Sequence, residues 1–462
     1  MKKYFIIPVL LLTLTFTSCF DDMDDVEQVA TTAQINDFIY RGLNFFYLYK
    51  ADTGELANDA FTSTQAKNQF ISSFDSPESF FSFLKSDQDR FSLLFDDYIA
   101  LENALGGISL NNGMDFGLVL YPDASGNVFG YVRLVLPNTS ASDAGLERGV
   151  IFNTVDGTQL NADNFNDLLT PDTYTIGLAT YDGTTLTPSS ESVTLIKTQY
   201  TEDPVYITKT LDVGGTKVGY IMYNSFTASF DETLNGAFGQ LQAEGVTELV
   251  LDLRYNGGGS VRTATDLSGM ITGQFTGQVF YTEQWNDDRQ AAYANNGLFT
   301  NVTRNDSPLN SLNLSRVHVL TTRRTASASE LVINGLAPYI DVVQVGTNTT
   351  GKFQASTILY DAPAPGFSRS EANPAHTYAM LPLIFKTANA AGNTDYVDGL
   401  LPDIELEIDY SNLGQLGNVN EPLLAAALNN ILPGPITPRR SATLEKELDV
   451  NNGLEIMVVE GF

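Results

Sequence analysis

The spacing of apolar residues predicts helices in the first part of the chain. Between residue 33 and about residue 105, apolar positions recur every three or four residues, as on one face of an amphipathic helix. The first such stripe comprises Ile35, Phe38, Ile39, Leu43 and Phe46. A second helix is predicted to begin at Ser76-Pro77-Glu78, with serine as its cap and proline in its first turn. We therefore expect a helical N-terminal domain over residues 33-106.

From Gly107 to about Thr198, short apolar segments alternate with turn residues, which indicates β-strands. Their order resembles that of a PDZ domain of the bacterial protease type. The segments that carry this resemblance are Met114 to Val119, Val128 to Leu136, Ala144-Gly145-Leu146, Arg148-Gly149-Val150-Ile151 and Val155-Asp156-Gly157. We therefore expect a PDZ-like, β-rich domain over residues 107-198.

A PDZ domain binds an extended peptide C-terminus by adding it to its sheet as one more strand. The resemblance implies that the loop holding the peptide carboxylate includes Phe116, Gly117 and Leu118. It also implies that the segment from Asn161 to Leu169 forms the helix beside the groove. The alternative is a PDZ fold that serves only as a spacer.

Strand-like and helix-like segments alternate from about Asp203 to Pro433, which is typical of α/β proteins. Strands are predicted at 217–222, 248–253, 317–322 and 341–345. An apolar helix running to about Tyr339 separates the last two, so we expect a crossover that makes them parallel. The fold class predicted for the whole chain is α+β and multidomain: a helical region, a PDZ-like domain and an α/β core over residues 199-433. Residues 434-462 are loop-rich and then apolar, and no role follows from their sequence.

The start of the chain has the pattern of an export signal. Lys2 and Lys3 precede an apolar stretch that is too short to span a membrane comfortably. The stretch ends in Phe16-Thr17-Ser18-Cys19, which resembles a bacterial lipobox. We expect a signal peptide over 1-18, a lipid on Cys19 that holds the protein to a membrane, and an acidic tether over 19-32. The alternative is a plain secretory signal followed by a free cysteine.

This pattern predicts an exported bacterial lipoprotein, either periplasmic or on the cell surface, with the outer membrane as the expected site of anchoring. The formal net charge of −30 leaves no basic stripe for phosphates, so we expect no nucleic-acid partner. With one cysteine and two histidines in 462 residues, an internal disulfide is excluded and an imidazole-based zinc site nearly so. Neither His318 nor His376 has a recognisable catalytic partner. We expect neither a cofactor nor a metal.

The residues with candidate chemistry lie after three predicted strands. Ser327 stands at the start of the apolar helix, Lys352 follows the next strand, and Gly257-Gly258-Gly259 follow the strand over 248–253. Carboxyl ends of parallel strands meet at one edge of a sheet, where open α/β sheets bind ligands. A serine hydroxyl needs a base within hydrogen-bond reach. Lysine, with a pKa of about 10.4 in water, can serve as that base only where burial lowers its pKa.

Together these segments resemble the tail-specific, or C-terminal processing, serine peptidases over nearly the whole mature chain. The motifs that carry the resemblance are Val250 to Gly259, Ser327-Ala328-Ser329-Glu330, Gly351-Lys352 and Gly399-Leu400-Leu401-Pro402-Asp403. The family implies Ser327 as nucleophile and Lys352 as general base. It also implies that the oxyanion is held by the amide of Gly258 or Gly259 and by that of Ala328.

This chain departs from the family pattern at a third polar position. Relatives commonly carry glutamine four residues after the lysine, where this chain has Ser356, with Gln354 two residues earlier. Either side chain could orient Lys352. An aspartate that some members carry in the helix after the nucleophile is replaced here by Pro338. Glu330 would lie in the first turn of that helix, where the helix dipole stabilises a negative charge. This local role is an alternative to a catalytic one.

The function predicted from the sequence is a membrane-anchored serine endopeptidase that cleaves proteins or peptides near their free C-termini. The PDZ-like domain would capture the substrate C-terminus. Two alternatives remain open. One is a non-enzymatic protein that binds an apolar ligand, because the same core fold occurs in retinoid-binding repeats of animal photoreceptors. The other is a scaffold in which the PDZ-like domain gathers partners and the catalytic site is vestigial.

Overall fold

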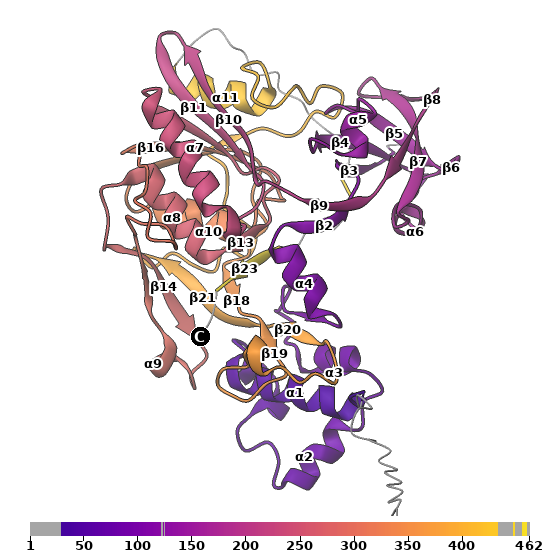
Figure 1. Ribbon diagram of the computed structural model, residues 1–462, viewed down its shortest axis with the longest axis vertical. Coiled ribbons are helices and arrows are strands. Elements are labelled where there is room, and N and C mark those ends of the chain that lie inside the picture. Colours follow the sequence, from indigo (N-terminus) through magenta and orange to yellow (C-terminus); the bar gives the residue numbers. More distant parts are fainter. Residues whose placement is uncertain (1–28, 122, 124, 433–446, 449–454, 460–462) are drawn as a thin grey trace, which may run out of the picture.

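The computed structural model describes residues 29–121, 123, 125–432, 447–448 and 455–459. The predicted signal peptide, Cys19, nearly all of the acidic tether and most of the segment after Pro433 lie outside these residues. Within the part that is described, no helix has both the length and the apolarity needed to cross a bilayer. Figure 1 shows three regions: N-terminal helices, a central α/β core, and a β-rich domain to one side of the core.

The N-terminal region is mainly helical, as predicted. Its helices are α1 (Thr32–Phe46), α2 (Thr64–Ile71), α3 (Pro77–Leu84) and α4 (Tyr98–Leu105), with short 3₁₀ turns η2 (Lys50–Asp52) and η3 (Gly54–Leu56). The predicted stripe of α1 is buried, and Ser76 caps α3 through the amide of Ser79. The region is not helical throughout, because β1 (Leu93–Phe95) pairs with β20 (Ala379–Leu381) of the core, which also pairs with β19 (Leu359–Tyr360). This pairing attaches the N-terminal region to the core.

The β-rich domain is joined to the rest by two strands, β2 (Ile108–Asn111) and β9 (Thr198–Thr201), which pair antiparallel (Figure 1). Its sheet has the order β3-β4-β5-β7-β8, with β6 paired to β5. These strands are β3 (Met114–Leu120), β4 (Val128–Val135), β5 (Ile151–Val155), β6 (Thr158–Gln159), β7 (Thr173–Tyr181) and β8 (Leu186–Ile196). Two short helices, α5 (Ser140–Asp143) and α6 (Phe165–Leu169), complete the domain. The helix predicted from Asn161 is therefore confirmed only from Phe165 onward.

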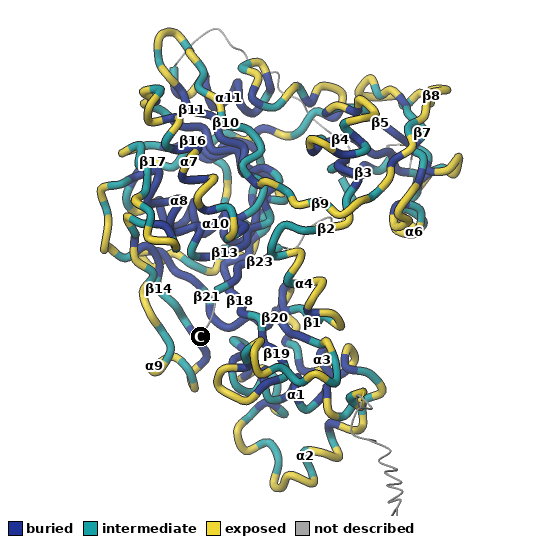
Figure 2. Tube along the Cα trace, in the orientation of Figure 1, coloured by how far each residue is buried: buried dark blue, intermediate teal, exposed yellow. Residues whose placement is uncertain are grey.

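The core is built on a six-stranded sheet of order β10-β11-β12-β16-β17-β22. Its strands are β10 (Val205–Val213), β11 (Thr216–Tyr223), β12 (Glu248–Asp252), β16 (Arg316–Thr321), β17 (Asp341–Gly346) and β22 (Ile404–Glu405). The pairings from β11 to β22 are parallel, so the four predicted strands and the predicted parallel crossover are confirmed. Alternate residues of β12 face two separate apolar clusters, which accounts for the burial of this strand on both faces. Figure 2 shows the interior of the core around β16 and α8 as buried.

Helices cover both faces of this sheet. The helices α7 (Asp231–Ala243), α8 (Val261–Thr272) and α10 (Ala328–Leu336) share one cluster, and α11 (Pro422–Ile431) belongs to the other. A second sheet has the order β13-β23-β18-β21-β14-β15. Its strands are β13 (Gly258–Ser260), β23 (Ile456–Val458), β18 (Gln354–Ser356), β21 (Leu383–Asn389), β14 (Val279–Trp285) and β15 (Asn296–Leu298). The remaining short helices are η4 (Ala228–Phe230), α9 (Gln290–Tyr293) and η5 (Arg369–Glu371).

Candidate active site

Ser327 lies between the end of β16 and the first residue of α10, where the chain turns sharply. Its backbone has φ 67° and ψ −115°, a left-handed conformation that L residues seldom adopt and that costs about 1–3 kcal/mol. The side chain is fully buried, and its Oγ has no hydrogen-bond partner among the described residues. A strained turn that presents an unpaired hydroxyl at a sheet edge is the arrangement expected of a nucleophile.

Lys352 lies in the loop between β17 and β18 and is also fully buried. Its Nζ donates to the backbone carbonyl of Glu455 over 2.5 Å and lies 5.0 Å from the centre of the Phe91 ring. Burial lowers the pKa of Lys352 to about 8, because the ammonium loses its hydration, while the charges of Glu455, Asp89 and Glu330 act in the opposite direction. In this structure the lysine therefore bonds to Glu455 and not to Ser327.

Glu330 connects the serine and the lysine through their backbones. Its Oε2 accepts hydrogen bonds from the backbone amides of Ser327 (2.7 Å) and Lys352 (2.8 Å). The two amide nitrogens therefore lie no further apart than the sum of these two distances. Its Oε1 accepts the Gly351 amide (2.7 Å) and the Thr349 hydroxyl (2.5 Å). Burial raises the pKa of Glu330 to about 7, and these four donors oppose the rise. Glu330 thus holds the loop after β17 against the start of α10.

The glycine turn after β12 lies directly against Ser327. Gly258 has φ +107° and Gly259 has φ +136°. A Cβ placed on Gly258 would lie 2.7 Å from Ser327 Cβ and 3.0 Å from the amide nitrogen of Ala328, so only glycine fits. The Gly258 amide already donates to Asn256 Oδ1 over 2.9 Å. The Gly258 amide is thus engaged within its own turn, whereas Gly259 pairs with the separate strand β23, and Gly259 and Ala328 remain the candidate oxyanion donors.

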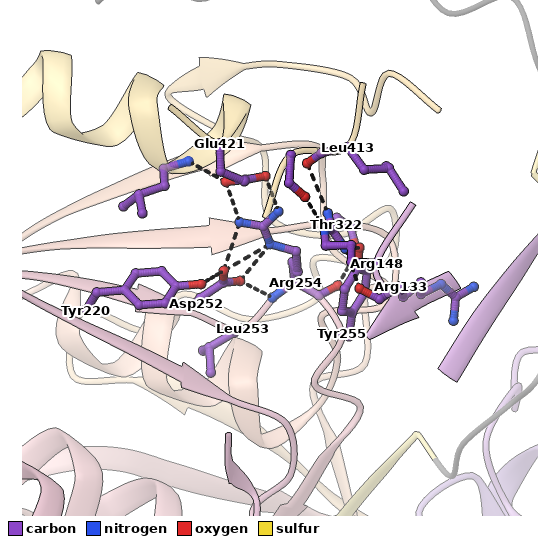
Figure 3. A network of polar contacts seen from close by, with 12 residues as sticks. Arg133, Arg148, Tyr220, Asp252, Leu253, Arg254, Tyr255, Thr322, Leu413 and Glu421 are labelled. Atoms are coloured by element: carbon purple, nitrogen blue, oxygen red, sulfur yellow. Dashed lines mark hydrogen bonds and ion pairs between the residues drawn. The ribbon is translucent and has the colours of Figure 1, made fainter. Parts of the chain in front are cut away.

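A buried ionic network fixes the strand that leads into this turn (Figure 3). Arg254 forms ion pairs with Asp252 (2.8 Å) and Glu421 (2.6 Å), and Tyr220 donates to Asp252 over 2.7 Å. The hydroxyl of Thr322, just after β16, donates to the carbonyl of Arg254. Breaking a buried pair of this kind is strongly destabilising, so the network keeps the glycine turn in register with the serine.

The two candidates for a third polar residue lie on β18 and do not bond to the lysine. Gln354 Nε2 donates to the hydroxyl of Tyr49 over 2.7 Å, which links β18 to the N-terminal region. Ser356 Oγ is buried and has no partner among the described residues. That either side chain orients Lys352 stays a prediction.

The sequence reasoning missed the residues that enclose the lysine. Phe91 belongs to a loop whose amides, at Phe91 and Ser92, are held by Asp89 Oδ1. Glu455 comes from the segment after Pro433, to which no role had been given. The only sequence signal was the apolar run Ile456-Met457-Val458-Val459, which is too short to show its partner strand.

A cavity of about 1090 Å³ adjoins the site between the core and the β-rich domain. The glycine turn lines it, together with Arg323, Arg324, Glu455 and Ile456. Ser327 and Lys352 are fully buried and do not line the cavity. The predicted PDZ loop residues also lie away from it: Phe116, Gly117 and Leu118 are on strand β3, where Leu118 and Val119 contact Leu448 and Glu447.

The comparisons with known proteins agree on one family of peptidases. Residues 217–362 match peptidase family S41, and residues 34–93 match the peptidase S41 N-terminal domain. A carboxyl-terminal-processing protease of Picosynechococcus sp. is 29% identical over 237 residues, which cover 48% of this chain and 50% of that protein. A second protease so named, from Synechocystis sp., is 30% identical over 138 residues, which cover 30% of this chain and 29% of that protein. The chain thus spans about half the length of the first of these relatives.

A solved structure from Bacteroides fragilis, assigned to the S41 proteases, is similar over most of the chain. The TM-score is 0.68 at 28% identity, and the match covers 85% of this chain and 96% of that one. The similarity therefore agrees with the fold derived above from the strands and helices of this chain.

Proposed function

The chain belongs to peptidase family S41, and we propose that it is a serine endopeptidase that cleaves proteins or peptides near their C-termini. Ser327 is the nucleophile and Lys352 is the general base. The observation that carries this assignment is a fully buried lysine, its pKa lowered to about 8, whose backbone is bonded to the same carboxylate oxygen as that of a strained, unpaired serine.

The proposed reaction uses Ser327 and Lys352 in turn. The neutral amine of Lys352 accepts the Oγ proton as Oγ bonds to the carbonyl carbon of the scissile peptide. The resulting oxyanion is held by the amides of Gly259 and Ala328, each worth about 3 kcal/mol in the transition state. The C–N bond then breaks, and Lys352 gives its proton to the leaving amine. Water, deprotonated by the same lysine, hydrolyses the ester on Ser327 and restores the enzyme.

The β-rich domain is proposed to capture the substrate C-terminus as an added strand, in the manner of a PDZ domain. Support comes from the position of β3: Glu447 bridges Val119 at its edge, and Asp115 of β3 lines the 1090 Å³ cavity together with Glu447 and Leu448. We also propose that the protein is exported and held to the outer membrane by lipid on Cys19. Support for this anchor is the sequence pattern of residues 1–19 alone.

One experiment tests the activity and the location together. Protein C-termini are compared across the proteome between wild-type cells and a Ser327→Ala strain, and both strains are fractionated. We expect a set of proteins with longer C-termini in the variant strain, and the enzyme in the membrane fraction of both. A fluorophosphonate probe should label the purified wild type and not Ser327→Ala. Equal labelling of both, or no difference in C-termini, would favour a binding protein or a scaffold over a peptidase.

A further inference from the structure

The proposed catalytic pair is covered by a segment of the same chain. Strand β23 pairs parallel with β13 in the register Gly258↔Ile456, Gly259↔Met457 and Ser260↔Val458, and Ser356 of β18 pairs with Val458. Figure 1 places β23 between the core and α4, beside β13 and β18. An extended segment that lies along the glycine turn occupies the place that a peptide substrate must take.

The polar groups of this segment engage the catalytic residues as a substrate backbone would. The carbonyl of Glu455 accepts the Lys352 ammonium. The carbonyl oxygen of Ile456 lies 2.4 Å from the point where a Cβ on Gly258 would stand, and the same point is 2.7 Å from Ser327 Cβ and 3.0 Å from the Ala328 amide nitrogen. A main-chain carbonyl therefore lies beside the nucleophile and the proposed oxyanion donor.

The same chain also occupies the edge of the β-rich domain. Glu447 forms an antiparallel bridge with Val119 of β3, and the amide of Leu448 donates to the Leu118 carbonyl over 2.8 Å. Leu448 packs on the apolar core of that domain. This is strand addition at a sheet edge, the mode by which PDZ domains bind peptides.

A built polar pocket receives the side chain of Glu447. Its Oε1 accepts from Arg133 (2.7 Å) and Tyr131 (3.0 Å), both buried, and from Arg324 at 3.5 Å, while Oε2 accepts from Tyr410 at 3.4 Å. Arginine and tyrosine donors converging on one carboxylate select an acidic group. The pocket joins the β-rich domain to the core through a residue that belongs to neither.

We propose that the described residues 447–448 and 455–459 act as a substrate-like inhibitor: Glu447 and Leu448 occupy the groove along β3, and the residues at 455–459 cover the catalytic residues. The folded enzyme has low activity while these residues are in place, and its activity rises when they leave. The groove then binds peptides that carry an acidic side chain followed by an aliphatic one, as Glu447-Leu448 do. This inference rests on the proposed function, since it takes Ser327 and Lys352 as the catalytic pair. The competing possibility is that β23 is a permanent strand, because Met457 is fully buried in the main core.

Two variants of the full chain weaken the two ends of the segment. Glu447→Ala removes the carboxylate from its pocket, and Met457→Asp places a charge where the core is apolar. Glu191→Ala, an exposed position on β8, is the matched control. We expect fluorophosphonate labelling of Ser327 and kcat/KM for a peptide substrate to rise at least tenfold in both variants, because each variant removes contacts that hold one end of the segment in place. The control should equal the wild type.

A synthetic peptide with the sequence from Glu447 to Val459, added to Met457→Asp, separates an inhibitor from a permanent strand. An inhibitor lowers the activity of the variant, competitively with substrate, and a peptide with alanine in place of Glu447 does so less. If β23 is a permanent strand, the peptide would instead complete the sheet and raise the activity of the variant. If Met457→Asp does not fold, as judged by circular dichroism, the same peptides are added to Glu447→Ala. An inhibitor would again lower the activity, and completion of a permanent strand would again raise it.

The inference and the proposed function fail differently. If the wild type is active, both variants are no more active, and the peptide does not inhibit, the inhibitory segment is overturned and the peptidase stands. If the wild type and both variants show neither labelling nor hydrolysis, with and without peptide, the proposed function falls and the inference falls with it. Weak labelling of the wild type with at least tenfold stronger labelling of both variants would support both.

Discussion

Lys352 shows how one residue depends on its surroundings for its chemistry. In water its amine would be almost fully protonated at neutral pH, and only burial makes the neutral form accessible. The folded pKa, about 8, lies below the ordinary 10.5. Between these values the unfolded chain binds the proton and the folded chain does not, so the free energy of unfolding should rise with pH in this window.

The pH profile of the reaction follows from the same shift. We expect kcat/KM to increase as pH rises through about 8, since the base works only when deprotonated. Lys352→Arg should lower kcat/KM by about 100- to 10,000-fold at every pH, because a guanidinium does not lose its proton in proteins. Hydrolysis of a fluorogenic peptide between pH 6 and pH 10 measures both, with circular dichroism to check folding. A wild-type profile that falls over this interval would exclude the lysine base.

At the scale of helices and strands, the parts that could be predicted from the sequence are those with local signals. The strands β11, β12, β16 and β17 are predominantly apolar segments, and the hydroxyl of Ser76 caps its helix by accepting from the amide three residues later. Short strands were missed because their partners are distant. The glycines of β13 have no apolar pattern, and their pairing depends on Ile456 and Met457 at the far end of the described chain. The role of Glu330 was missed for the same reason, since its partners at 349–352 belong to another loop.

A substitution of Glu330 tests how the loop after β17 is held against the start of α10. A glutamine at this position keeps the shape but presents N–H groups to two of the four donors, so we expect Glu330→Gln to lower the free energy of unfolding of the core by about 3 kcal/mol. It should also lower kcat more than it changes KM, because the loop carrying Lys352 loses its tie to Ser327. Glu191→Gln on the exposed face of β8 is the control. Denaturant unfolding and steady-state kinetics are the measurements. A variant with the wild-type free energy of unfolding and the wild-type kcat would show that Glu330 does not hold the Lys352 loop against Ser327.

At the scale of the whole molecule, separate regions meet at the site. The N-terminal region supplies Phe91 against the lysine, and the β-rich domain supplies the groove that holds Glu447. Arg148 of that domain donates to its own domain at the Arg133 carbonyl (2.6 Å), and to the core at the Tyr255 hydroxyl (2.8 Å) and the Gly414 carbonyl (2.9 Å) (Figure 3). The domains are thus bonded together on both sides of the cavity.

Removing the wall that the N-terminal region provides should change the chemistry without touching a reacting group. We expect Phe91→Ala to admit water to Lys352 and to move the apparent pKa of kcat/KM upward from about 8, toward the ordinary value. Activity at pH 7 would fall several-fold and would recover in alkaline buffer. Phe83→Ala, an exposed phenylalanine of α3, should leave the profile unchanged. An unshifted pKa in Phe91→Ala would mean that other groups keep the amine dry.

The left-handed backbone at Ser327 has a consequence for descendants of this chain. Its φ and ψ are the mirror image of an ordinary extended conformation, which glycine adopts freely and serine does not. A lineage released from the need to cut peptide bonds would gain stability by exchanging this serine for glycine. Under the proposed function, the side chain at this position serves turnover, and glycine here in a homologue would identify a fold that has been turned to some other use.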